Sequence, residues 1–206
     1  MNSKQVEELV LQSLEHELGG TKVYAAALEC VVNADLENEW TRYLEETRTH
    51  VTRLEGVCRA LGIDARKQTP GRAVVRTVSE ALVAAMKQAL SAGDPGAAQL
   101  VAAECVVLAE TKDHLDWTLI GKCAEQMDGR GGEALQSACA EIEDQEDEHL
   151  YHTRGWCREL WIESLGLSAV LPPPEERRQV KTAMGAAKAE QEAEKVRLQR
   201  SAAERD

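Results

Sequence analysis

The sequence predicts an all-α protein built as a four-helix bundle, and three observations support this fold class. Only five prolines occur in 206 residues, and three of them are consecutive, at 172–174. Elsewhere Ala, Leu, Glu, Lys, Arg and Gln dominate, and these residues favour helix. Apolar residues recur at alternating spacings of three and four, as on the buried face of an amphipathic helix. A chain of this length is expected to form one well-buried domain and a tail.

Two helices are predicted in the first part of the chain, over residues 5–32 and from about residue 35 to residue 61. The pair Gly19 and Gly20 is costly inside a helix, so it marks either a break or the close approach of a neighbouring helix. We favour close approach, beside Glu17. A short turn at 33–35 and a stop at Gly62 make the two helices an antiparallel hairpin.

The middle of the chain is predicted to cross over to a second hairpin. Residues 63–93 contain a loop with Pro70 and then a short helix, whose apolar residues include Val74, Val78 and Met86. Asp94 and Pro95 can cap and open the next helix, which is expected to reach about residue 127.

Three glycines between residues 129 and 132 turn the chain into the last predicted helix, from about residue 133 to residue 165. Two antiparallel hairpins joined by a crossover make a four-helix bundle, predicted over residues 1–171. Residues 172–206 form a polar tail that begins with the prolines and is expected to be helical or disordered.

Composition excludes several classes of protein. The net charge of −12 and the pI near 5.0 argue against a nucleic-acid partner, which needs clustered Lys and Arg. No run of about 18 apolar residues occurs, and the N-terminus leads directly into a charged amphipathic pattern, so we expect no membrane span, no signal peptide and a cytoplasmic location. The six cysteines form no Cys-x-x-Cys motif and are predicted to be reduced residues of the core or its boundary.

Acidic and imidazole side chains interrupt the apolar faces of the predicted helices. Glu17 and Glu110 each lie in such a face, seven residues before an aromatic residue. Glu146 and His149 are three residues apart on one face of the last helix and form a Glu-x-x-His pair. Burying an ionised carboxylate costs several kcal/mol unless a cation, a metal or a hydrogen bond compensates it, so such a cluster suggests a metal site.

Residues equidistant from the turn of an antiparallel hairpin lie at the same height. Glu17 is therefore expected level with His50, and Glu110 level with His149. Glu46 lies four residues before His50, and both fall toward the edge of their helix face. Carboxylate and imidazole donors of this kind suit iron or manganese better than zinc.

The pattern resembles the ferritin-like di-iron carboxylate superfamily, in which two helices give one Glu each and the other two give a Glu-x-x-His each. Residues 17–24, 44–55 and 102–117 are similar to the small bacterial stress-response branch, and the resemblance spans roughly residues 5–165. It implies that Glu17 and Glu110 are single ligands, with Glu146 and His149 as one intact pair. The second helix departs from the pattern because Thr47 stands three residues before His50. Its carboxylate must come from Glu46, or the site is asymmetric, or it has lost one metal.

The resemblance implies two non-haem iron ions, with manganese as the alternative, and oxidation of Fe(II) or reduction of peroxide in a stress or iron-handling role. The partners would be metal ions with O₂ or peroxide, and no catalytic residue is distinct from the ligands. His114 is a candidate outer partner or substitute ligand, and His152 is a further substitute. His16 is expected to be exposed.

Two other functions stay open from the sequence. A non-catalytic helical-bundle interaction protein would keep the fold with a degenerate metal site, and its crossover and tail would bind partners. A homodimer or a protein partner bound through the tail is compatible with the sequence. An oxygenase acting on an organic substrate would need an apolar channel to the site.

Overall fold

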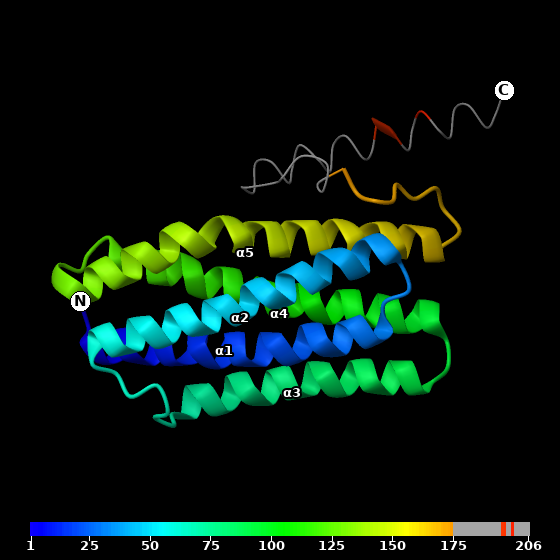
Figure 1. Cartoon of the computed structure of the whole chain (residues 1–206). Helices are drawn as coiled ribbons and strands as arrows, with labels where there is room; N and C mark the ends of the chain where they lie inside the picture. Colours follow the sequence, from blue (N-terminus) through cyan, green and yellow to red (C-terminus); the bar gives the residue numbers. More distant parts are fainter. Residues whose placement is uncertain (175–194, 197–198, 200–206) are drawn as a thin grey trace.

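A computed structural model describes residues 1–174, 195–196 and 199 of the chain. This described part is all-α, as predicted, and contains no strand. Its five helices lie side by side along one direction (Figure 1), and they are α1 (Ser3–Cys30), α2 (Ala34–Leu61), α3 (Pro70–Ser91), α4 (Pro95–Ala124) and α5 (Gly129–Ser164).

The helix ends follow the capping residues of the sequence. The side chain of Asn33 accepts hydrogen bonds from the backbone N–H groups at the start of α2, and Gly62 ends that helix in the left-handed conformation with a φ of 70°. Asp94 caps α4, and Pro95 is its first residue. The last helix begins four residues earlier than predicted, at Gly129. Its first turn lies so close to the preceding loop that a Cβ on Gly132 would stand 1.8 Å from the carbonyl oxygen of Met127.

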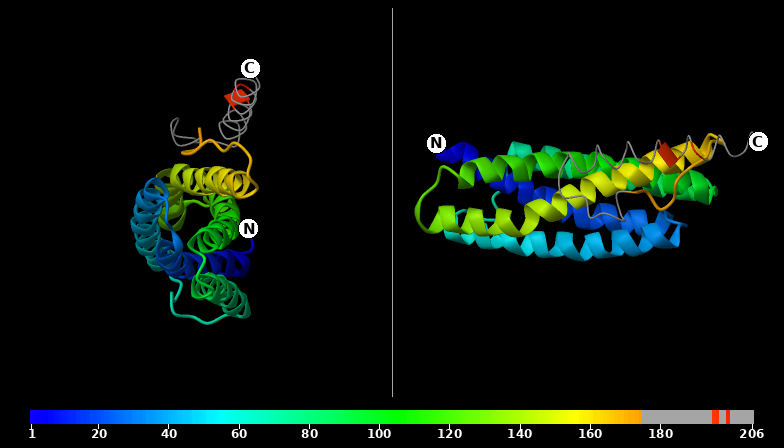
Figure 2. Two further views of the ribbon diagram at one scale, coloured as in Figure 1. Left: turned by 90° about the vertical axis from the view of Figure 1, so that its right-hand side faces the viewer. Right: turned by 90° about the horizontal axis from the view of Figure 1, so that it is seen from above.

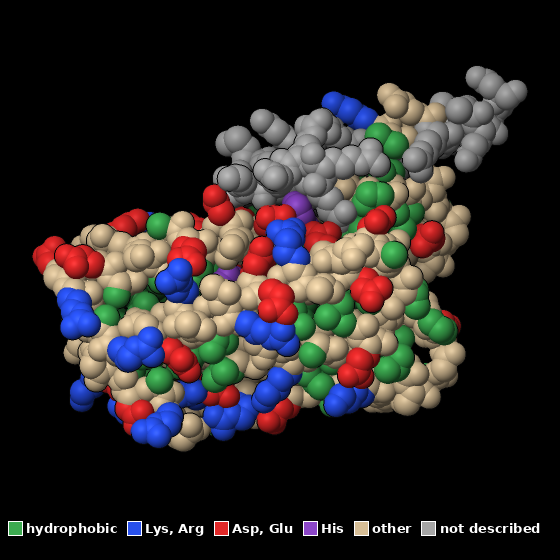
Figure 3. Space-filling model, in the orientation of Figure 1, with side chains coloured by type: hydrophobic (Ala, Val, Ile, Leu, Met, Phe, Trp, Pro, Cys, Tyr) green, Lys and Arg blue, Asp and Glu red, His purple; other side chains and the backbone are tan. Residues whose placement is uncertain are grey.

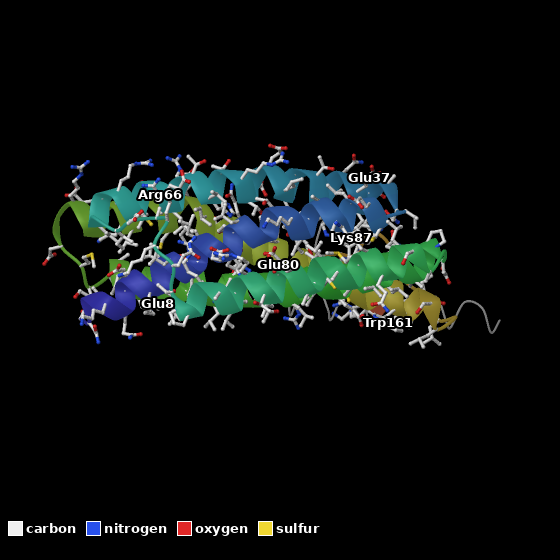
Figure 4. All side chains as sticks on the ribbon, turned by 90° about the horizontal axis from the view of Figure 1, so that it is seen from below. Glu8, Glu37, Arg66, Glu80, Lys87 and Trp161 are labelled. Atoms are coloured by element: carbon white, nitrogen blue, oxygen red, sulfur yellow. The ribbon has the colours of Figure 1, made fainter. Side chains whose placement is uncertain are left out.

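Four of the helices form a closed ring, and the fifth lies outside it. Around the ring α1 contacts α2, α2 contacts α5, α5 contacts α4, and α4 contacts α1. Helix α3 packs on α1 and α4 from outside, as the end-on view of Figure 2 shows. From the side of α3, Figure 4 shows this helix running along α1.

The crossover helix is not short, which corrects the prediction. Helix α3 has 22 residues and packs along α1. Val75, Ser79 and Met86 on its inner side are buried. Exposed Glu80 and Lys87, labelled in Figure 4, belong to the other sides of the same helix. Amphipathic packing of this kind stabilises a helix more than propensity alone.

The two glycines of α1 allow neighbouring helices to approach. Helix α1 is continuous across them. A Cβ on Gly19 would lie 2.2 Å from the Oγ atom of Ser79 in α3, and a Cβ on Gly20 would lie 3.2 Å from the Cγ2 atom of Thr47 in α2. The expectation of close approach rather than a break is therefore confirmed.

The apolar core is divided into two clusters at opposite ends of the ring. One contains Tyr24, Trp40 and Trp156, and the other contains Leu54 and Ile120 with their neighbours. Between the clusters, each of the four ring helices carries buried polar residues at mid-length. The fold thus places a polar layer across the middle of an otherwise apolar interior.

Other predictions concern the surface, the cysteines and the tail. All six cysteines are free, four of them buried and two half-buried. Within the described ranges, no helix is both long and apolar enough to span a bilayer. On the face shown in Figure 3, acidic and basic side chains are interspersed. Most of the predicted tail, residues 172–206, lies outside the described residues.

Candidate metal centre

Five acidic and imidazole side chains from four helices meet in the polar layer. Each is at most 4 % exposed, although carboxylates are among the groups least often buried. Helices α1 and α2 contribute one residue each, α4 contributes one and α5 two, and these residues are Glu17, His50, Glu110, Glu146 and His149. The structure therefore brings together all the sequence candidates of first rank except Glu46.

The donor atoms form two groups that share one residue. Glu17, His50 and Glu146 offer atoms that all lie within 4.8 Å of one another, and so do Glu110, Glu146 and His149. The Nδ1 atom of His50 lies 2.9 Å from Oε1 of Glu146 and 3.4 Å from Oε1 of Glu17. The Nδ1 atom of His149 lies 3.7 Å from Oε2 of Glu110 and from Oε1 of Glu146. Glu146 is the one residue common to both groups.

Both imidazole rings turn Nδ1 toward the cluster and are held through Nε2 from outside. The Nε2 atom of His50 lies 2.8 Å from Oε1 of Gln145, and that of His149 lies 2.8 Å from Oε2 of Glu46. Both outer atoms are acceptors, so Nε2 carries the hydrogen and a neutral ring keeps its Nδ1 lone pair for a ligand. Histidines that bind metals are commonly fixed in this way.

Several buried atoms of the cluster make no hydrogen bond with any residue that the structure describes. These atoms are Oε2 of Glu17, Oε2 of Glu110, both carboxylate oxygens of Glu146, and Nδ1 of His50 and His149. Some of them are close together, but without the alignment of a hydrogen bond. The carboxylates are also unpaired with any described lysine or arginine. Buried polar atoms are rarely left in this state, and a cation would compensate them.

The electrostatics of the cluster show an excess of acid. Burial raises the pKa of Glu17 and of Glu110, and the charge of Glu146 raises both further. Burial also opposes the charge on His50, but Glu17 and Glu146 raise its pKa to about 11. Burial likewise acts to raise the pKa of Glu146, yet the His50 ring 2.9 Å away and the charge of His149 lower it overall. A proton on His50 supplies one positive charge against three carboxyl groups.

Glu46 lies outside the cluster. Its side chain is 21 % exposed, and it faces Nε2 of His149 and, at 3.4 Å, Nη1 of Arg42. It therefore sits on the side of the His149 ring away from the two donor groups. In this arrangement it orients the histidine and offers no oxygen to the cluster's interior.

The second-rank histidines have other partners. His114 is half-buried, and its Nδ1 atom lies 3.2 Å from Oδ1 of Asp147. His152 is buried, with Nδ1 at 2.9 Å from Oε1 of Glu39 and at 3.2 Å from the hydroxyl of Tyr43. Neither histidine belongs to the two donor groups.

His16 is buried, and this corrects the expectation that it is exposed. It lines a largely apolar pocket of about 370 Å³ between α1, α3 and α4. Helix α3, predicted as part of a short crossover, instead covers this side of α1. Burial lowers the pKa of His16 to about 4, and the charge of Lys112 contributes in the same direction.

Two residues near the cluster, Gln145 and Asp113, were not predicted from the sequence, and Trp117, predicted as a core aromatic, also bonds to a cluster residue. Gln145 holds His50, and the indole N–H of Trp117 donates to Oε1 of Glu17 at 2.9 Å. Asp113 of α4 is 4 % exposed, and its Oδ1 atom has no hydrogen-bond partner among the described residues. Asp113 could have been found from its spacing, since it lies three residues after Glu110 and four before Trp117.

Comparison with known proteins found no matching family model, no matching curated protein and no matching solved structure. The assignment of this centre therefore depends on its own residues. Three carboxylates and two imidazoles, with uncompensated buried atoms close to one another, form groups that could hold a metal ion.

Proposed function

We propose that α1, α2, α4 and α5 form a ferritin-like four-helix bundle that binds two non-haem metal ions, with iron as the natural occupant and manganese as the alternative. The observation that carries the proposal is the pair of donor groups that share Glu146. In a hydrocarbon-like interior, the ionised form of such a set of acids is stable only if positive charge is supplied. Two cations bridged by one carboxylate meet this requirement.

Each residue would have a separate task at this centre. Glu17 and His50 would hold one ion, Glu110 and His149 the other, and Glu146 would bridge them. Gln145 and Glu46 fix the orientation of the two rings through Nε2, and Trp117 fixes the Glu17 carboxylate. The donors are thus positioned before an ion arrives, which reduces the cost of ordering them.

The chemistry that such a pair supplies is oxidation of Fe(II) with O₂ or peroxide, or reduction of peroxide, in a stress or iron-handling role. The chain itself contributes a water-poor site with fixed donors. Both ends of the site are closed by the apolar clusters, so access must come from the sides of the ring.

The direct test measures metal content. The full chain is loaded anaerobically with Fe(II), freed of loose metal, and its iron is counted per chain; about two ions are expected. The double variant Glu110→Ala, Glu146→Ala is expected to retain none. On exposure to O₂, the loaded wild-type chain should form Fe(III), as followed by its ultraviolet absorbance.

A matched control separates metal binding from general damage to the core. Glu159 is also a buried glutamate of α5, but it is bonded to Arg158 and to the backbone N–H of Val170. Glu159→Gln should keep the full metal content of the wild-type chain. A wild-type chain that takes up no metal, with stability unchanged in the double variant, would instead support a non-catalytic interaction protein.

A further inference from the structure

The four-carboxylate pattern of the resemblance has a gap in α2, at Thr47. Thr47 is buried, and its hydroxyl donates to the backbone oxygen of Tyr43 at 2.8 Å. Its methyl group faces Gly20, where an added Cβ would lie 3.2 Å from it. Since Glu46 points to the outside of His149, α2 provides His50 and no carboxylate.

We propose that Asp113 of α4 is the fourth carboxylate of the metal centre and replaces the acid that α2 lacks. This assignment rests on the proposed metal-binding function. It gives four carboxylates and two imidazoles, the same donor total as in the resemblance, with two acids on α4. The centre of this chain is therefore asymmetric, with a Glu-x-x-Asp on α4 facing the Glu-x-x-His on α5.

The first observation that supports this assignment is the spacing of Asp113 from Glu110 and Trp117 on α4. Residues three and four apart lie on the same face of a helix. One turn before Asp113, Glu110 reaches His149 at 3.7 Å. One turn after it, Trp117 bonds Glu17 at 2.9 Å. Asp113 is in neither donor group itself, but it lies between two residues of α4 that each touch a different donor group.

The second observation is that the Asp113 carboxyl group is buried and lacks a hydrogen bond at Oδ1 with any described residue. It is 4 % exposed, and its Oδ1 atom makes no hydrogen bond within the described part of the chain. Burial raises its pKa well above the ordinary value, and the charges of Glu146, Glu17 and Glu110, in that order, add to the shift. A buried carboxyl group that lies among other acids, and whose Oδ1 atom has no described hydrogen-bond partner, is a candidate for compensation by a cation.

A second buried acid on the same helix, Asp116, has a charged partner. Asp116 is 2 % exposed, but Nζ of Lys112 lies 2.5 Å from its carboxylate. It therefore needs no metal. Because Asp113 and Asp116 share residue type, helix and burial, the second is a matched control for the first.

The test uses Mn(II) alone, which binds without the oxidation that complicates Fe(II). Binding of Mn(II) to the full chain is measured by titration calorimetry for the wild type, Asp113→Asn and Asp116→Asn, with thermal unfolding of each metal-free protein as a check on folding. We expect Asp113→Asn to lower the affinity for one of the two Mn(II) ions about tenfold or more. Asp116→Asn should leave the affinities for both ions unchanged.

The outcomes are distinguishable. Wild-type affinity and stoichiometry in Asp113→Asn would overturn the assignment of Asp113 while leaving the metal centre in place. A wild-type chain that binds no Mn(II) or Fe(II) would overturn the proposed function and this assignment together. If Asp113→Asn fails to fold, Asp113→Ala provides the same comparison. Equal weakening by Asp113→Asn and Asp116→Asn would also contradict the assignment, because it would indicate a general effect of removing buried acid.

Discussion

Glu15 and Glu17 lie two residues apart on α1, and both are buried, yet their surroundings are opposite. Glu15 accepts hydrogen bonds from Arg72 and Arg76 of α3, at distances from 2.6 to 3.0 Å. Glu17 has a bond from Trp117 and a histidine 3.4 Å away, and no described lysine or arginine pairs with it. The hydrogen bond from Arg76 is the main cause that lowers the pKa of Glu15, whereas burial raises that of Glu17.

The difference teaches that burial of an acid does not by itself indicate a metal site. Glu15 is a structural ion pair that joins the outer helix α3 to the ring. Glu17 belongs to a cluster whose acids face one another. Only the absence of compensation in the second case suggests a cation. Substitutions at both positions can therefore test this comparison directly.

The largest effect is expected from Glu15→Gln. The change leaves Arg72, which is 3 % exposed, without its charged partner. Removing one member of a buried ion pair typically costs about 3 kcal/mol or more of the free energy of unfolding. Urea denaturation at pH 7 of the metal-free chain measures this loss, and unchanged stability would show that the pair contributes nothing.

The same variant gives a pH dependence. The pKa of Glu15 is lowered from 4.5 in the folded chain, so its stabilisation is present above that value and disappears as the pH falls through the folded pKa. The stability difference between wild type and Glu15→Gln should therefore shrink in acid.

A smaller effect of opposite sign is expected from Glu17→Gln in the metal-free chain. Burial raises the pKa of Glu17 above its ordinary value, so this carboxyl group opposes folding at pH values above that ordinary value. Glutamine keeps an acceptor for Trp117 and removes the acid, so we expect the free energy of unfolding to stay unchanged or to rise, by less than the loss in Glu15→Gln. A loss as large as that of Glu15→Gln, measured in the same urea series, would mean that Glu17 is already compensated without metal.

The smallest effect concerns the half-exposed pair of His114 and Asp147. The hydrogen bond to Asp147 is the main cause that raises the pKa of His114 above 6.5. Its stabilisation should be complete below pH 6.5 and disappear as the pH rises through the raised value. Because the pair is partly solvated, we expect less than about 1 kcal/mol.

Thermal unfolding of wild type and Asp147→Asn from pH 5.5 to 8.5 checks this effect. The two melting temperatures should converge at the alkaline end. A constant difference over the whole range would contradict a role for the charge of His114.

Local sequence features determined the positions of the helices. Asn33, Gly62, Asp94 and Pro95 act within a few residues of themselves, so their effects can be read without knowledge of the fold. The helical period also determined that Glu17, Glu110, Glu146 and His149 face inward. From the position of the hairpin turn, Glu17 was expected at the same height as His50. The 3.4 Å distance between Oε1 of Glu17 and Nδ1 of His50 agrees with this expectation.

Only the tertiary structure decided which residues at the margins of these faces lie inside. Asp113 and His114 flank the same face of α4, and packing against α1 and α5 buries the first and leaves the second half-exposed. Glu46 lies at the margin of α2 and turns to the outer side of His149. Likewise, α3 buries His16 and supplies the arginines that neutralise Glu15. Periodicity specifies a direction around one helix, whereas compensation of a buried charge depends on side chains from other helices, which only the folded chain brings together.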